Sequence, residues 1–161
     1  MCSDERPQVM NWETWQRAIE LDGSSLWDAY VLRTDHSDWQ RLLDWLHASG
    51  LRLRFERGGV PEPLPFAVDD AFVHHADEET CALFIDLAGV RVNTHFFVGE
   101  EIELDIGPRE VRSEHDLVRL RDLLTDIATL LGKPVLITPE NGQKMPWFEI
   151  APDGATRSFV E

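Results

Sequence analysis

Three side chains near the middle of the chain could perform acid–base chemistry. His95 can take up or release a proton near neutral pH. Glu103 and Asp105 stand two positions apart, so a strand would place both carboxylates on one side of a sheet. If His95 faces Asp105 across a hairpin, the pair has the form of a general base and the carboxylate that orients it. Asp86 is a further carboxylate that the strand pattern turns to the same side.

Other signatures of catalysis or metal binding are missing from the sequence. A triad-type hydrolase needs a nucleophile, but there is no Gly-x-Ser-x-Gly, and the strand pattern turns Cys81 to the opposite side of the sheet. The adjacent His74 and His75 would point to opposite sides of a strand, so they cannot readily share one metal ion. No glycine-rich phosphate loop or dinucleotide-binding fingerprint is present. We therefore predict no metal site and no cofactor.

The candidate residues belong to a region, residues 80–106, in which apolar and polar side chains alternate in three successive stretches. Alternation with a period of two predicts strands with one buried side. A two-residue turn at Ala88–Gly89 would join the first two strands and pair Leu87 with Val90, since glycine readily adopts positive φ. The pattern predicts a meander of three antiparallel strands.

The connection between the second and third strands can be chosen by the same reasoning. A two-residue turn there would place carboxylates on the apolar side, which is costly. A three-residue loop from Gly99 to Glu101 avoids this and pairs Val98 with Ile102 and Thr94 with Ile106. We therefore predict the three-residue loop.

The other side of this meander carries charged, polar and aromatic side chains, and we call it the polar face. Asp86 would face Arg91 across the first hairpin, and His95 would face Asp105 across the second. A surface that mixes charge with aromatic rings suits protein recognition. The predicted protein-binding residues are Asp86, Arg91, Asn93, His95, Phe97, Glu103 and Asp105.

Two amphipathic helices are predicted at about residues 36–48 and 114–131. Asp35 and Ser113 are suitable N-caps, and a glycine follows each helix where a left-handed C-terminal residue belongs. Each helix has one apolar stripe, so both should pack on one face of the sheet. The polar face would then be either open or covered by a shorter N-terminal helix from Trp12 to about Leu21.

These elements predict an α+β fold: a mostly antiparallel sheet of about six strands, with a central meander at about residues 81–106 and the two main helices on one face. Residues 38–46 and 116–124 share the pattern Asp-Φ-x-Arg-Leu-x-Asp-Φ-Leu, which favours two strand–helix–strand halves. Binary patterning alone would also generate much of this match. We expect residues 1–161 to form a single domain, with residues 1–25 as an N-terminal extension.

The chain is strongly acidic, with 30 acidic and 15 basic residues and a formal net charge of −15. This charge disfavours binding to nucleic acids or anionic membranes but steers basic partners. No apolar run approaches the ~18 residues of a membrane span, and the N-terminus lacks the apolar core of a signal peptide. We predict a cytoplasmic protein that binds neither nucleic acid nor membrane.

The leading functional hypothesis is therefore a small acidic protein-binding protein rather than an enzyme. One concrete form is an immunity protein that neutralises a basic toxin enzyme. One alternative is an enzyme with hydrolase-like acid–base chemistry that uses His95 with Asp105, Glu103 or Asp86. Another is a homodimer or larger homo-oligomer that assembles through an exposed strand edge.

Overall fold

The computed structural model describes residues 8–72, 80–140, 142–143 and 145–161. Within these residues, nine strands form one antiparallel sheet in the order β3-β2-β4-β5-β6-β1-β7-β8-β9. The strands are β1 (Trp27–Leu32), β2 (Arg52–Arg57), β3 (Val60–Glu62), β4 (Cys81–Leu87), β5 (Val90–His95), β6 (Glu101–Ile106), β7 (Val135–Pro139), β8 (Phe148–Ile150) and β9 (Thr156–Ser158). The helices are α1 (Trp12–Leu21), α2 (His36–Ala48), α3 (Asp69–Phe72) and α4 (Glu114–Leu131), with a short 3-10 helix, η2 (Pro108–Glu110). The α+β prediction is confirmed, and β3 and β9 are short strands that the sequence did not indicate.

The helices begin where their capping residues predict. The Asp35 side chain accepts a hydrogen bond from the backbone N–H of Asp38, and the Asp38 side chain accepts one from that of Asp35. At α4 the Ser113 side chain accepts from the backbone N–H of Asp116, the Asp116 carboxylate accepts from that of Arg112, and Gly132 ends the helix in the left-handed conformation at φ 64°. Local hydrogen bonds thus define these ends without help from the rest of the fold.

The first hairpin has the predicted register. Leu87 lies opposite Val90 and Asp86 opposite Arg91. Ala88 and Gly89 form the turn with positive φ angles of 54° and 102°. A two-residue turn of this kind twists in the sense that the flanking strands require.

The predicted register of the second hairpin is wrong by two residues. Thr94 lies opposite Leu104 rather than Ile106. Strand β5 ends at His95, and Val98, which was expected on the apolar side, is 44% exposed in the loop. The longer loop is bonded to the β1–α2 connection. The backbone N–H of Thr34 donates to the Glu100 carbonyl (3.0 Å), and its hydroxyl donates to the Gly99 carbonyl (2.7 Å).

The two strand–helix–strand halves are β1-α2-β2 and β6-α4-β7. Their order of elements is the same, as the shared pattern indicated. Their positions in the sheet differ, since β6 and β7 have only β1 between them, whereas three strands separate β1 from β2. Strand β1 therefore stands inside the second half.

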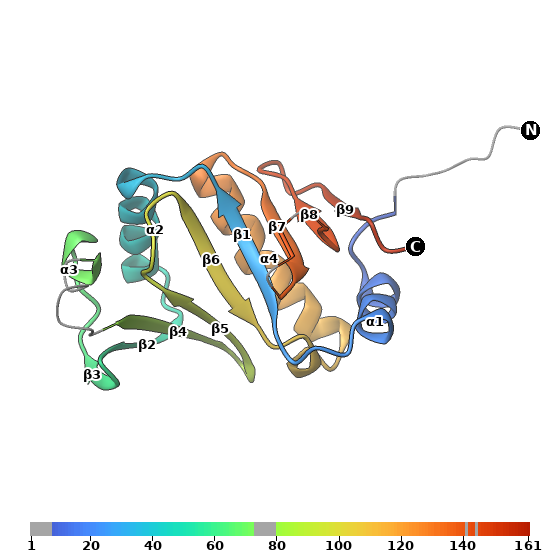
Figure 1. Ribbon diagram of the computed structural model, residues 1–161, viewed down its shortest axis with the longest axis horizontal. Coiled ribbons are helices and arrows are strands. Elements are labelled where there is room, and N and C mark those ends of the chain that lie inside the picture. Colours follow the sequence, from blue (N-terminus) through green and yellow to red (C-terminus); the bar gives the residue numbers. More distant parts are fainter. Residues whose placement is uncertain (1–7, 73–79, 141, 144) are drawn as a thin grey trace, which may run out of the picture.

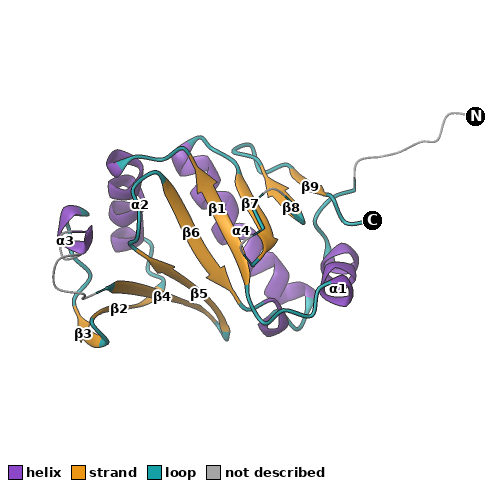
Figure 2. Cartoon of the chain, viewed as in Figure 1, coloured by secondary structure: helices purple, strands orange, loops and turns teal. Residues whose placement is uncertain are grey.

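The main helices cover one side of the sheet, as predicted. Figure 2 shows α2 and α4 behind the strands, and no described helix lies over β1 and β6 on the near side. Helix α1 packs on the helical side too, because Trp15 is fully buried, stacks on Phe148 (5.7 Å between ring centroids) and meets Trp27 edge-on (4.9 Å). The polar face is thus not covered by α1. The division into a domain and an N-terminal extension stays a prediction.

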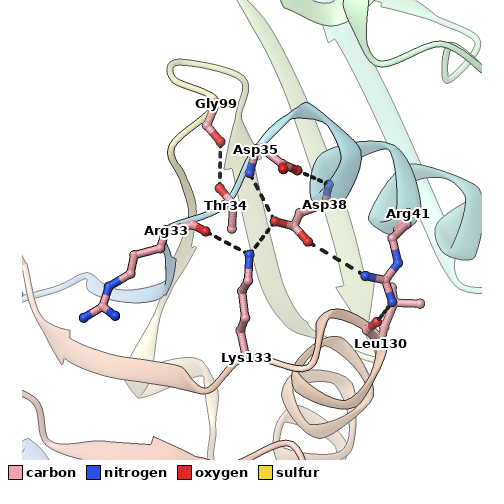
Figure 3. Close-up of polar contacts among 8 residues, drawn as sticks. All are labelled: Arg33, Thr34, Asp35, Asp38, Arg41, Gly99, Leu130 and Lys133. Carbon is pink, nitrogen blue, oxygen red and sulfur yellow. Dashed lines mark hydrogen bonds and ion pairs between the residues drawn. The ribbon is translucent and has the colours of Figure 1, made fainter.

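A polar network joins the two halves just beyond the end of β1 (Figure 3). Lys133, which follows α4, donates from Nζ to the Asp38 carboxylate (2.6 Å) and to the Arg33 carbonyl (2.8 Å). Asp38 is 6% exposed, so its charge would be costly without this partner. Arg41 adds a longer contact of 3.9 Å to Asp38 and donates to the Leu130 carbonyl.

Replacing Lys133 should test this connection. We expect Lys133→Met to lower the free energy of unfolding by about 2 kcal/mol, less than for a fully buried pair because the lysine side chain is 31% exposed. Arg41→Met is the control, since this side chain is 51% exposed, and it should cost less than about 1 kcal/mol. Urea unfolding measures both, and equal losses would contradict a special role for Lys133.

Candidate functional site

The centre of the polar face is built by three adjacent strands, β5, β6 and β1. Because β6 lies in the middle, its outward side chains have neighbours on both sides. Asp105 lies opposite Asn93 of β5 and Asp28 of β1, and Glu103 lies opposite Tyr30. The pairing of β1 with β6 thus adds Asp28 and Tyr30 to the residues predicted from the meander.

Three carboxylates meet at this point, and we call Asp28, Glu103 and Asp105 the acid cluster. Each offers an oxygen within 4.8 Å of the other two. Asp28 is only 2% exposed and accepts a hydrogen bond from the hydroxyl of Tyr30 (3.1 Å). Carboxylates this close to one another raise one another's pKa.

The segment between β7 and β8 reaches back across the polar face. Gln143 in this segment donates from Nε2 to the carboxylate of Glu101, at the start of β6 (2.6 Å). Tyr30 is 3% exposed even though it lies on this side of the sheet. The polar face is therefore partly covered over β1 by its own chain.

His95 lies beside the acid cluster. Its Nε2 is 3.5 Å from Oδ2 of Asp105, so the predicted closeness of these residues is confirmed, although Asp105 is paired with Asn93 in the register. The imidazole stacks on the ring of Phe97 with 5.1 Å between centroids and 10° between planes. Phe97 is 51% exposed and presents its ring to solvent.

Two of the predicted site residues lie apart from this centre. Asp86 and Arg91 face each other at the turn end of the first hairpin, as expected. Arg91 forms its ion pair with Glu110 (3.1 Å) instead of Asp86, and Asp86 accepts a hydrogen bond from the backbone N–H of Gly89 (2.9 Å). Asp86 thus supports the turn, and the acid–base alternative is limited to His95 and the acid cluster.

The environment shifts the proton affinity of three groups. Burial, and then the charges of Asp28, Asp105 and Glu101, raise the pKa of Glu103 above its usual value. The hydrogen bond with Asp105 raises the pKa of His95, while burial opposes this shift. Burial and the charges of Asp28 and Glu103 raise the pKa of Tyr30, so it stays a hydrogen-bond donor at neutral pH.

His95 and the acid cluster could support proton transfer or the binding of a cation. His95 and Asp105 can move a proton, and Glu103 can act as an acid because its pKa is raised. Cys81 is buried on the helical side, as predicted, so its thiol faces away from His95 even though Ala82, the next residue, lies opposite His95. Three carboxylates at this spacing also match the oxygen donors that Ca²⁺ or Mg²⁺ prefers. The pair His74 and His75 lies outside the described residues.

Sequence reasoning missed Asp28 and Tyr30. The alternation in β1 turns Trp27, Ala29 and Val31 toward the helices, so it would have placed Asp28 and Tyr30 on the other side. An aspartate between the apolar residues Trp27 and Ala29 was the available signal. The alternation does not reveal that β1 lies beside β6.

In comparisons with known proteins, the chain matches no family model, no curated protein and no solved structure. Among the residues that the structure describes, no helix has the length and apolar character needed to cross a membrane. The function is therefore argued from the site itself.

The raised pKa of Glu103 predicts a measurable pH dependence. Glu103 has a higher pKa in the folded protein than in the unfolded chain. The protein therefore loses stability as pH rises from the unfolded-state pKa through the folded-state pKa of this group. Glu103→Gln should therefore raise the free energy of unfolding at pH 7 by about 0.2–1 kcal/mol, because it removes the repulsion between Glu103 and the neighbouring carboxylates. The same substitution should flatten the decline in stability above the unfolded pKa.

Glu13→Gln is the matched control, because it removes the same charge from an exposed position in the first turn of α1. Urea unfolding between about pH 4 and pH 8 covers the range in which carboxyl groups and histidine titrate. A loss of stability at pH 7 in Glu103→Gln that matches or exceeds the loss in Glu13→Gln would show that the acid cluster is not repulsive.

Proposed function

We propose that this protein binds a basic protein through its polar face, as an intracellular inhibitor that neutralises a cationic enzyme such as a toxin. The observation that supports this function best is the acid cluster, at the centre of a sheet face that no described helix covers. Glu103 and Asp105 are partly exposed on this face, so a partner can reach them.

Charge supports a basic partner over a neutral one. The net charge of −15 attracts cationic proteins at long range and raises their association rate. At short range, a lysine or arginine side chain docked at Glu103 would offset the repulsion that raises its pKa. Binding should therefore lower the pKa of Glu103, because the cation of the partner reduces the repulsion within the acid cluster.

The rim of this surface supports a protein rather than a small cation. Phe97 and Val98 are 51% and 44% exposed in the β5–β6 loop, next to His95. Interfaces combine such exposed aromatic and aliphatic side chains with a few well-placed charges. The predicted residues Asn93, His95, Phe97, Glu103 and Asp105 lie within this surface, and the buried Asp28 and Tyr30 adjoin it.

The same geometry favours a second candidate, an acid–base enzyme. His95 and Asp105 are 3.5 Å apart, and the pKa of Glu103 is raised, which is the pattern of a base with an orienting carboxylate and a nearby acid. Water would have to serve as the nucleophile. This candidate requires activity that His95→Ala abolishes.

A binding selection with matched variants tests the proposal. Protein fragments displayed on phage are selected on the immobilised protein, and the fragments retained should be basic. Glu103→Gln/Asp105→Asn should weaken their binding about tenfold or more, because each buried charge contact contributes 1.4 kcal/mol or more. Glu13→Gln/Glu20→Gln makes the same change in net charge on exposed positions of α1 and should bind almost as well as wild type.

Salt provides a second readout. Affinity should fall between about 0.05 and 0.5 M NaCl, because screening weakens charge steering. The proposal fails if both double variants bind equally, or if the selected fragments shift resonances of α1 and α4 instead of β5 and β6. Concentration-dependent self-association that Glu103→Gln/Asp105→Asn leaves unchanged would instead support a homodimer formed through an exposed strand edge.

A further inference from the structure

A second site lies on the polar face, at the end of β1. It is a pocket of ≈380 Å³. This volume is within the range of about 300–1,000 Å³ that small-molecule sites occupy. The residues that line it are Leu32, Arg33, Lys133, Pro134, Leu136 and Glu149.

The floor of the pocket is apolar. Leu136 is paired with Tyr30 on one side and Glu149 on the other, so it points to the polar face. Leu32 points the same way from β1, and Pro134 precedes β7. Apolar side chains on the exposed side of a sheet, grouped in a hollow, offer a surface for an apolar group.

Arg33 stands at one side of this floor in a strained conformation. Its φ is 57°, in the left-handed region that costs most residues about 1–2 kcal/mol. The carbonyl of Arg33 accepts a hydrogen bond from Nζ of Lys133, which also donates to the carboxylate of Asp38. Figure 3 shows the guanidinium of Arg33 turned away from this network. Strained residues held by their surroundings are often functional.

The two charges at the pocket remain available to a ligand. Arg33 and Glu149 both line the pocket, and no hydrogen bond or ion pair joins either side chain to a described residue, although Arg157 of β9 lies opposite Glu149. Lys133 does not add to this charge, because Asp38 already neutralises it. The pocket thus presents one guanidinium and one carboxylate beside an apolar floor.

We infer that this pocket binds a zwitterion with an apolar body, of the class of a free aliphatic amino acid or a short apolar peptide. The carboxylate of the ligand meets Arg33, its ammonium group meets Glu149, and its apolar body lies on Leu32 and Leu136. A ligand with only a carboxylate would be repelled by Glu149, and a ligand with only an ammonium group would be repelled by Arg33. This site is independent of the proposed protein partner.

Titration with a small panel of ligands tests the inference. Leucine, Leu-Leu and Leu-Leu-Leu are zwitterions whose charges are separated by up to about 3.5 Å more per added residue. N-acetyl-leucine, leucinamide and N-acetyl-leucinamide carry only the negative charge, only the positive charge and no charge. One zwitterion should shift the amide resonances of Leu32, Leu136 and Glu149, and its singly charged and neutral analogues should bind about tenfold or more weakly. The zwitterion that binds best distinguishes an amino-acid site from a peptide site.

Variants identify the two charged groups. Arg33→Gly removes the guanidinium but adopts positive φ without strain, so the fold is retained. Arg33→Gly and Glu149→Gln should each abolish binding of the zwitterion, and Arg112→Gln, at an exposed arginine outside the pocket, should leave it unchanged. The inference is overturned if no zwitterion shifts these resonances, if N-acetyl-leucinamide binds as well as leucine and its peptides, or if Arg33→Gly binds normally.

Discussion

The position of β1 between β6 and β7 is the constraint on which the polar face depends. Trp27 is paired with Ile106 on one side and with Pro139 on the other, so β1 is locked from both edges. Its apolar side chains then face α2 and α4, and Asp28 is brought beside Asp105. The acid cluster lies on one flank of β1 and the zwitterion pocket on the other, so both proposed sites arise from this one insertion.

The acid cluster destabilises the fold locally, and packing elsewhere in the protein offsets this effect. Carboxylates that are partly buried beside one another oppose folding at neutral pH, as the raised pKa of Glu103 indicates. The helical side of the sheet offsets this cost, because Trp15, Trp27 and Trp39 are almost completely buried there. A protein that keeps such a cluster on a well-packed sheet is consistent with selection for binding, since stability alone would favour neutral side chains.

Alternation along the strands predicted the side of each residue but could not decide its partner. A shift of two residues keeps every side chain on its face, so the pairings of Thr94 with Ile106 and with Leu104 satisfy the same pattern. In the observed register the β5–β6 loop accepts two hydrogen bonds from Thr34, which is distant in sequence. His95 still reaches Asp105, because side chains on diagonal positions of adjacent strands are within contact distance.

The sequence by itself determined the elements whose signals are local. Capping residues set the ends of α2 and α4, and alternation assigned Glu103 and Asp105 to the polar face, because these signals act within a few residues of the chain. Only the tertiary structure decided which strands are neighbours. The pairing of Asp28 with Asp105 and the pocket that Arg33 and Glu149 both line join residues far apart in the chain, and no short-range periodicity encodes such neighbours.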